Sequence, residues 1–226
     1  MSDEIAGHQG RADRGPVLDT VERVSEMCFG LFMALTFVGA VSAATGGQEA
    51  QAAMTMFYTA LGCNLAWGLV DAVMYLVRTL TDRGKRLTLA MAVRAAPDEA
   101  AAEKILREEL PPLVARLVGD EELKAIRRQL VSHRLPDKPR FHARDFKGAL
   151  GIFVIVVLST FPVALPFIVV KDVPTALFVS RVLSVLMLFG GGYALGRHAG
   201  YSGWKAGFGM AVMGVLLTMA VIALGG

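Results

Sequence analysis

One long apolar stretch, residues 52–80, constrains the fold of this chain more than any other part of its sequence. As a helix rising about 1.5 Å per residue, it would exceed the roughly 30 Å hydrocarbon core of a bilayer. Asn64, Asp71 and Arg78 interrupt it at intervals of seven residues, which places them on one stripe of a helix. A carboxylate at such depth is costly and usually faces a bundle interior or a hydrated cavity. The stretch therefore predicts a membrane helix with a polar wall.

This polar stripe has two interpretations. In the functional one, Asn64, Asp71 and Met74 line a path for a solute through the membrane. In the structural one, Asn64 bonds a neighbouring helix, and Asp71 pairs with an arginine such as Arg181. The sequence alone leaves both open.

Four further segments are long and apolar enough to cross a bilayer, so we expect an all-α polytopic membrane protein with five transmembrane helices. The five segments are approximately 27–45, 52–80, 148–170, 175–196 and 206–224. A hydrophobic content of 54% and a mean hydropathy of +0.50 are too high for an ordinary soluble domain. The first 26 residues are too polar and acidic for a secretory signal peptide.

The loop charges predict the orientation in the membrane. Residues 78–147 carry sixteen Lys and Arg against eleven Asp and Glu, whereas the Gly46–Glu49 loop has no basic residue. Because an excess of Lys and Arg stays cytoplasmic, we expect the N-terminus inside and the C-terminus outside, in a bacterial cytoplasmic membrane. The net charge of +3 then reflects topology, and no nucleic-acid partner is expected.

The same analysis divides the chain into four parts. We expect a disordered tail over 1–16, and a lead-in helix with the first two spans over 17–80. A small helical cytoplasmic insert follows over 81–146, and the last three spans over 147–226. In the insert, Asp98 is expected to cap a helix over 99–110 and Asp120 one over 121–131, with Pro111–Pro112 between them. So small an insert favours packing on a partner subunit, and hence a homodimer.

Acidic residues outside the spans are the remaining candidate metal ligands. Glu22 and Glu26 lie on one face of the lead-in helix, which either is solvated or attracts cations. Glu99 and Glu103 share a face of the insert, where interleaved basic residues favour a salt-bridged helical hairpin over a metal site. The cysteines and histidines show no zinc spacing.

Prolines and glycines mark the structural features of the last three spans. Pro162 and Pro166 should kink the third span and free backbone carbonyls within the membrane. Gly190, Gly191 and Gly192 allow close helix contact in the fourth. The spans contain no Ser/His pair, His-x-x-x-His or Gly-x-Ser-x-Gly motif, so we do not expect an enzyme.

The order of these features resembles the vacuolar iron transporter family. The first span contains GLFMALTFVGAVSAA, the third FPVALPF, and the last two SRVLSVLMLFGGG and GYSGWKAGFGMAVMG. The resemblance covers about residues 17–226 and implies five membrane helices with an insert between the second and third. It also implies a transporter of a divalent metal cation, with Asp71 and Met74 in the place of the family's second-helix glutamate and methionine.

The chain departs from the family pattern at two places. Phe29 stands where the family carries an aspartate before the first-helix glycine, and Glu26, one turn earlier, is the candidate replacement. The insert lacks the family's Glu-x-x-Glu pairs.

We therefore expect a transporter of Fe²⁺ or Mn²⁺ that exchanges the metal for protons, with Glu26, Asn64, Asp71 and Met74 along the path. The metal ion would be the substrate, and no permanently bound cofactor is expected. Hard oxygen ligands with one thioether suit these ions better than Cu⁺ or Zn²⁺. The alternative is a non-transporting membrane scaffold that keeps the transporter fold and binds partners.

Overall fold

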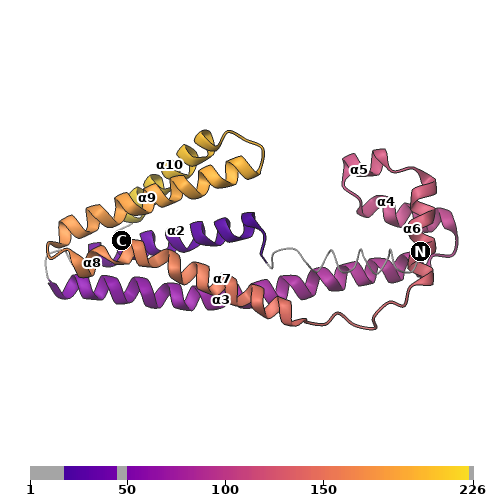
Figure 1. Cartoon of the computed structure of the whole chain (residues 1–226), viewed down its shortest axis with the longest axis horizontal. Coiled ribbons are helices and arrows are strands. Elements are labelled where there is room, and N and C mark those ends of the chain that lie inside the picture. The colour runs from indigo at the N-terminus through magenta and orange to yellow at the C-terminus, as the bar shows by residue number, and fades with distance from the viewer. Residues whose placement is uncertain (1–17, 45–49, 224–226) are drawn as a thin grey trace. The chain divides into compact units, whose positions relative to one another are not determined.

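The computed structural model describes residues 18–44 and 50–223, and all regular structure in these residues is helical (Figure 1). The helices are α2 (Thr20–Ala44), α3 (Ala50–Ala95), α4 (Glu99–Glu109), α5 (Pro112–Leu117), α6 (Asp120–Ser132), α7 (Ala143–Ala164), α8 (Pro166–Val169), α9 (Val173–His198) and α10 (Gly203–Ala223). The predicted tail over 1–16 lies outside the described residues.

The chain divides into two compact units. Of the described residues, 18–44, 50–75 and 144–223 form the first, here called the bundle unit, and 76–143 form the second, the insert unit. Helix α3 runs without interruption from Ala50 to Ala95, so it belongs to both units.

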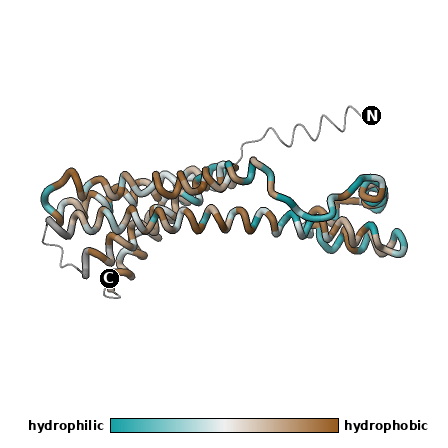
Figure 2. The backbone as a smooth tube through the Cα atoms, turned by 90° about the horizontal axis from the view of Figure 1, so that it is seen from below, coloured by the Kyte–Doolittle hydropathy of each residue, from teal (hydrophilic) through white to brown (hydrophobic). Residues whose placement is uncertain are grey.

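Four of the described helical segments are long and apolar enough to cross a membrane. They are Ala53–Ala95, Ala143–Val169, Val173–His198 and Gly203–Ala223. The fold is therefore all-α and polytopic, as predicted, while the predicted count of five spans is approximate. Helix α2 lies outside this set, and the side chains at its apolar C-terminal end are only partly described. Figure 2 shows hydrophobic residues along much of the bundle unit and hydrophilic ones concentrated in the insert unit.

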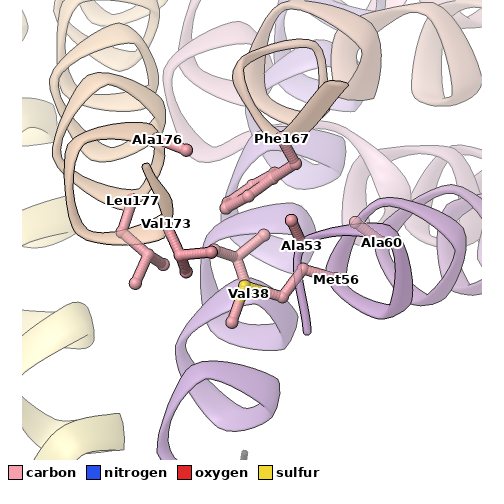
Figure 3. Packing of buried hydrophobic residues seen from close by; sticks show 8 residues of the cluster. All are labelled: Val38, Ala53, Met56, Ala60, Phe167, Val173, Ala176 and Leu177. Atoms are coloured by element: carbon pink, nitrogen blue, oxygen red, sulfur yellow. The ribbon is translucent and has the colours of Figure 1, made fainter. Parts of the chain in front are cut away.

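Two clusters of buried side chains hold the bundle unit together. In the first, Val38 of α2 and Met56 of α3 contact Phe167 of α8 and Val173 of α9 (Figure 3). In the second, Leu31 and Ala34 of α2 meet helices α7 and α9. Close packing of these side chains holds α2 and α9 against their neighbouring helices, since van der Waals contact is what joins apolar helices in lipid.

Glycines permit the closest contacts of α9. A Cβ atom on Gly191 would lie 2.5 Å from Cys28 Sγ on α2, and one on Gly192 would lie 2.7 Å from the Ala206 carbonyl oxygen on α10. Gly190 faces open space. Gly191 and Gly192 therefore lie where α9 approaches its neighbours closely, whereas Gly190 does not.

The two prolines end α7 within the apolar span. Pro162 lies inside α7, which ends at Ala164, and Pro166 opens the single turn of α8. The Val163 carbonyl, in the last turn of α7, accepts a hydrogen bond from Ser180 Oγ on α9 (2.7 Å). A neighbouring helix thereby supplies a donor where the helix breaks, as backbone groups in lipid require.

The insert unit is a helical hairpin packed on the last part of α3. Its core consists of Val93 of α3, Ala102 and Leu106 of α4, and Leu123 of α6. Asp98 caps α4 as predicted, accepting a hydrogen bond from the Ala101 amide (2.7 Å).

The prediction that Asp120 caps the next helix is wrong. Gly119 is the N-cap residue, and Asp120 lies in the first turn of α6, where its carboxylate pairs with Arg107. The Pro111–Pro112 segment does more than separate two helices, because Pro112 opens the short helix α5. Proline fits there since the first helical position needs no amide donor.

Candidate cation path in the helical bundle

Asn64 is the point at which three helices of the bundle unit meet through polar contacts. It lies on the inner face of α3 and is fully buried. Its Nδ2 donates to the carbonyl oxygen of Gly30 on α2 (2.9 Å) and to the hydroxyl of Thr160 on α7. The structural interpretation of Asn64, a bond to neighbouring helices, therefore holds in this structure.

Glycines bring the three helices close enough for these bonds. A Cβ on Gly30 would collide with the Ser159 hydroxyl and lie 2.9 Å from the Val156 carbonyl oxygen of α7. A Cβ on Gly68, one turn beyond Asn64, would lie 3.3 Å from Phe153. Small residues at these positions allow the backbones of α2 and α3 to approach α7 directly.

The surroundings of Asn64 are rich in oxygen atoms. Ser159 and Thr160 donate their hydroxyls to the Val156 carbonyl at 2.7 and 3.3 Å. Asn64 Oδ1 is buried and accepts no hydrogen bond from the described residues. Leaving an amide oxygen unsatisfied costs free energy, and carbonyl and hydroxyl oxygens are the ligands that hard cations prefer.

Asp71 lies farther along the same helix, at the edge of the buried face. It is half-buried, and its Oδ2 atom is shielded from solvent. Seven residues along α3 separate it from Asn64, or roughly 10 Å of helix. Met74 is 46% exposed, and its neighbours Val70 and Val73 are exposed to a similar degree. The structure thus places Asn64 inside the bundle, Asp71 at its boundary and Met74 on its outer surface.

The two acidic candidates of α2 have different settings. Glu22 is exposed, and its Oε2 accepts a hydrogen bond from the Asp19 amide (2.8 Å) at the start of the helix, while Asp19 Oδ1 accepts one from Val21. This reciprocal arrangement is a capping box. Glu26, one turn later, is half-buried. Within the described residues, no three His, Cys, Asp or Glu side chains are placed to hold one metal ion.

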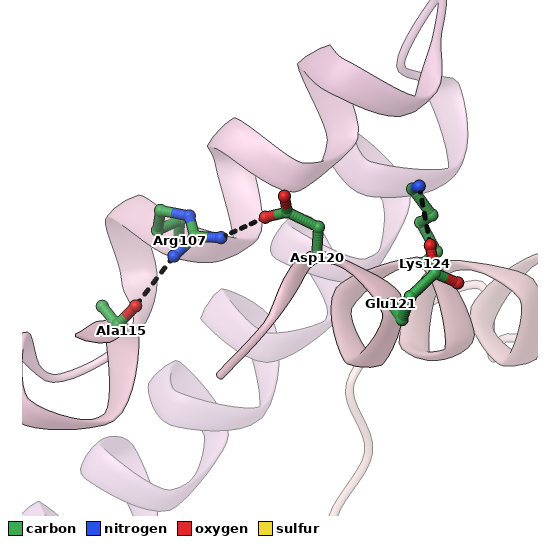
Figure 4. Close-up of polar contacts among 5 residues, drawn as sticks. All are labelled: Arg107, Ala115, Asp120, Glu121 and Lys124. Carbon is green, nitrogen blue, oxygen red and sulfur yellow. Dashed lines mark hydrogen bonds and ion pairs between the residues drawn. The ribbon is translucent and has the colours of Figure 1, made fainter. Parts of the chain in front are cut away.

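Several acidic residues of the insert unit form ion pairs. Glu99 lies 4.0 Å from Arg127, and Glu103 is half-buried on the same helix. Arg107 donates to Asp120 (2.7 Å) and to the Ala115 carbonyl (2.8 Å), as Figure 4 shows. This is the salt-bridged hairpin that the interleaved charges favoured.

Lys124 and Glu121 form a further exposed pair at 3.0 Å in the insert unit (Figure 4). The hydrogen bond and charge of Lys124 lower the pKa of Glu121, and Glu121 in turn raises the pKa of Lys124. Both groups are in water, so the pair adds little to stability.

Sequence analysis missed two polar features of α7. Asp145, in the first turn, is only 4% exposed, although Arg144 and Lys147 around it suggest a residue at the membrane surface. Its position just before an apolar span is the sequence signal that could have identified it as a buried polar residue. Ser159 and Thr160, which meet Asn64 and Gly30, carry no distinctive sequence pattern.

Together these features define a polytopic, all-helical membrane protein with a charged helical insert and a polar contact between three helices in its bundle. The sequence profile of the VIT family, the vacuolar iron transporters, matches residues 83–226, more than half of the chain. The protein therefore belongs to this family, as its resemblance predicted. A comparison with curated proteins found no match.

Family membership supports a coarse functional statement. The VIT family is a family of membrane transporters for metal ions, which agrees with the expectation that the chain is not an enzyme. Its apolar helices indicate an integral, multi-pass membrane protein.

Proposed function

We propose that this protein carries a divalent metal cation, Fe²⁺ or Mn²⁺, across the membrane in exchange for protons. Membership of a metal-transporter family supports the general class. The observation that carries the finer proposal is Asp71, a carboxylate inside the apolar stretch of α3 with one oxygen shielded from solvent. Such a group inside a membrane helix requires a functional or structural partner.

Competition between a proton and a metal ion for Asp71 supplies the coupling. A shielded carboxylate is stabilised either by protonation or by a nearby cation. A divalent ion that reaches Asp71 would displace its proton, and departure of the ion would allow reprotonation. Exchange then follows from one site with two alternative occupants.

The remaining path residues would act at other positions of the bundle. Glu26 would attract the ion at the start of the path, and the oxygen-rich surroundings of Asn64 would receive it beyond Asp71. Carboxylate and amide oxygens together with the Met74 thioether suit Fe²⁺ or Mn²⁺. Glu22, Glu99 and Glu103 would contribute more weakly, because Glu22 and Glu99 are exposed and Glu103 is only half-buried, so water competes for these carboxylates.

Met74 can take part only if its outer face of α3 is covered. In a single chain, Met74 and the apolar residues beside it are exposed. We therefore propose a homodimer in which a second copy covers this face. The mass of the purified full chain in nanodiscs tests this assembly, and a monomer there would contradict it.

The orientation follows from the positive-inside rule. With its excess of Lys and Arg, the insert unit would lie in the cytoplasm, with the N-terminus inside and the C-terminus outside. Asp120 is exposed on α6, so a cysteine substituted there would be accessible from the side of the membrane that holds the insert unit. Because that side would be the cytoplasm, this cysteine should resist a membrane-impermeant thiol reagent applied to intact cells. Labelling at that position from outside would contradict this orientation.

A flux assay with the purified full chain tests the transport proposal. Sealed proteoliposomes containing a pH-sensitive dye would be given Fe²⁺ or Mn²⁺, and metal uptake and internal pH would be recorded together. Asp71→Asn keeps the shape of the side chain and removes its charge, so uptake should fall to the level of empty liposomes. Asp71→Glu should retain part of the activity.

Asp82→Asn is the matched control, because Asp82 is exposed farther along the same helix. This variant should transport like the parent. Normal transport by a folded Asp71→Asn variant would show that Asp71 is not on the path. A folded parent that moves no divalent metal would support the scaffold alternative.

A further inference from the structure

A basic cavity in the insert unit is separate from the proposed cation path. It has a volume of about 380 Å³, within the range of small-molecule sites. One wall is the α3 segment that contains Arg83, Arg86, Leu87 and Ala90. The other is the non-helical segment before α7. Its lining residues are Leu135, Pro136, Lys138, Pro139, Arg140 and His142.

The two walls are held together by specific contacts. Arg83 Nη1 on the first wall donates to the carbonyl oxygen of Arg140 on the second (2.9 Å). Gly84 brings the α3 backbone near Pro139, whose ring would lie 3.9 Å from an added Cβ. Pro136 and Pro139 also restrict the backbone of the second wall. The cavity is therefore a formed feature of the insert unit.

The lining combines cations with an apolar floor. Arg83, Arg86, Lys138 and Arg140 carry positive charge, and none of the described residues that line the cavity is acidic. Leu87, Ala90 and Leu135 supply apolar surface beside them. Guanidinium groups bind the planar array of phosphate oxygens in a bidentate manner, and a lysine adds a point charge. An anion that carries both phosphate and apolar carbon matches this combination.

Chain connectivity brings both walls to the ends of membrane helices. The apolar stretch of α3 ends at Leu80, and Arg83 follows three residues later, roughly 5 Å along the helix. His142, at the end of the second wall, directly precedes α7 at Ala143. Basic clusters next to membrane helices attract anionic lipid headgroups.

We propose that this cavity binds a phosphate-bearing anion, and that the headgroup of an anionic phospholipid is its source. The phosphate would lie among the guanidinium groups of Arg83 and Arg86 and the ammonium group of Lys138. The carbon atoms of the headgroup, such as the glycerol of phosphatidylglycerol, would lie along Leu87 and Leu135, and the acyl chains would extend from the phosphate back toward the membrane. This site is independent of metal transport, so its test does not depend on the outcome of the flux assay.

Native mass spectrometry of the full chain tests the proposal by counting bound lipids. The protein in detergent would be titrated with phosphatidylglycerol or with phosphatidylcholine. The parent should retain one tightly bound phosphatidylglycerol and no phosphatidylcholine. The double variant Arg86→Gln/Lys138→Gln removes two cavity cations and should weaken that binding by about tenfold or more, as expected for losing charge-assisted bonds.

The matched control removes the same charge elsewhere. Arg94 and Arg116 are exposed in the insert unit and do not line the cavity. The Arg94→Gln/Arg116→Gln variant should bind phosphatidylglycerol within about twofold of the parent. Equal weakening in both double variants would show that net charge, and not the cavity, attracts the lipid, and would overturn the proposal. Circular dichroism would confirm equal helix content in all three proteins.

A competition with inorganic phosphate identifies the source of the anion. Phosphate that fails to displace phosphatidylglycerol at millimolar concentration supports the lipid as the occupant. Displacement at low concentration supports the phosphate chemistry and assigns it to a soluble ligand. Absence of binding by either compound would overturn the site.

Discussion

The bundle unit and the insert unit are both helical, yet they treat polar groups in opposite ways. The bundle buries Asn64, Thr160 and Ser180 and joins each of them to another helix by a hydrogen bond. The insert keeps its charges at the surface in pairs such as Arg107–Asp120. The surrounding solvent explains the difference, because lipid offers no hydrogen bonds whereas water competes for every exposed charge.

The two units also differ in how they pack. In the bundle, glycines bring helix backbones into contact, so adding one methyl group meets backbone atoms. In the insert, a few apolar side chains form one small core beneath exposed helices. The stability of the bundle should therefore fall when side-chain volume is added, and that of the insert when side-chain volume is removed. Three substitutions test this contrast, beginning with the largest expected effect.

Replacing Leu123 with alanine should have the largest effect on stability. Leu123 is 1% exposed at the centre of the insert core, and such truncations cost about 2–5 kcal/mol. Hydrogen exchange should become faster throughout α4 and α6. Leu117→Ala makes the same change at a side chain that is 77% exposed and should leave exchange unaltered. Similar exchange in both variants would refute the small-core interpretation.

Adding a methyl group at Gly192 should have the next largest effect, now in the bundle. The new Cβ would meet the Ala206 carbonyl and Met210 of α10, and overpacking of this kind costs about 1–3 kcal/mol. The unfolding temperature in detergent should fall for Gly192→Ala. Gly190 lies two residues earlier and faces open space, so the unfolding temperature of Gly190→Ala should stay near that of the parent. If both variants unfold alike, backbone contact between α9 and α10 does not limit stability.

The smallest effect is expected from Lys124→Gln in the insert. Because the bond and charge of Lys124 lower the pKa of Glu121, the substitution should raise that pKa toward its ordinary value. In the parent, any stability from this pair is present above the unfolded pKa of Glu121 and lost as pH falls through its folded value. An NMR titration would detect the shift, while helix content at neutral pH should not change. An unchanged Glu121 titration would mean that the pair does not form.

Local patterns were sufficient to predict the helices and some of their ends. The helix over 52–80 and the Asp98 cap depend on neighbouring residues, and both were recognised from the sequence. The family was also recognisable from the order of its spans. These features are encoded within single segments, so they can be identified without tertiary information.

Contacts between helices could not be predicted in the same way. The sequence does not reveal that Asn64 meets Gly30 and Thr160, which lie 34 and 96 residues away. Nor does it distinguish Gly190 from its two neighbours, since helix rotation decides which of them faces α2 or α10. The prediction that Asp120 caps a helix was wrong, because its actual pairing with Arg107 depends on how α4 and α6 pack and cannot be inferred from the local sequence.

The hydrogen bond between Ser180 and the Val163 carbonyl bears on how the chain enters the membrane during synthesis. When the end of α7 leaves the ribosome, the donor that satisfies its broken end has not yet emerged, since Ser180 lies 17 residues later. A lone α7 would expose that carbonyl to hydrocarbon. The smallest segment that can insert with this group satisfied therefore extends from α7 into α9, which makes the two helices a single unit of membrane insertion.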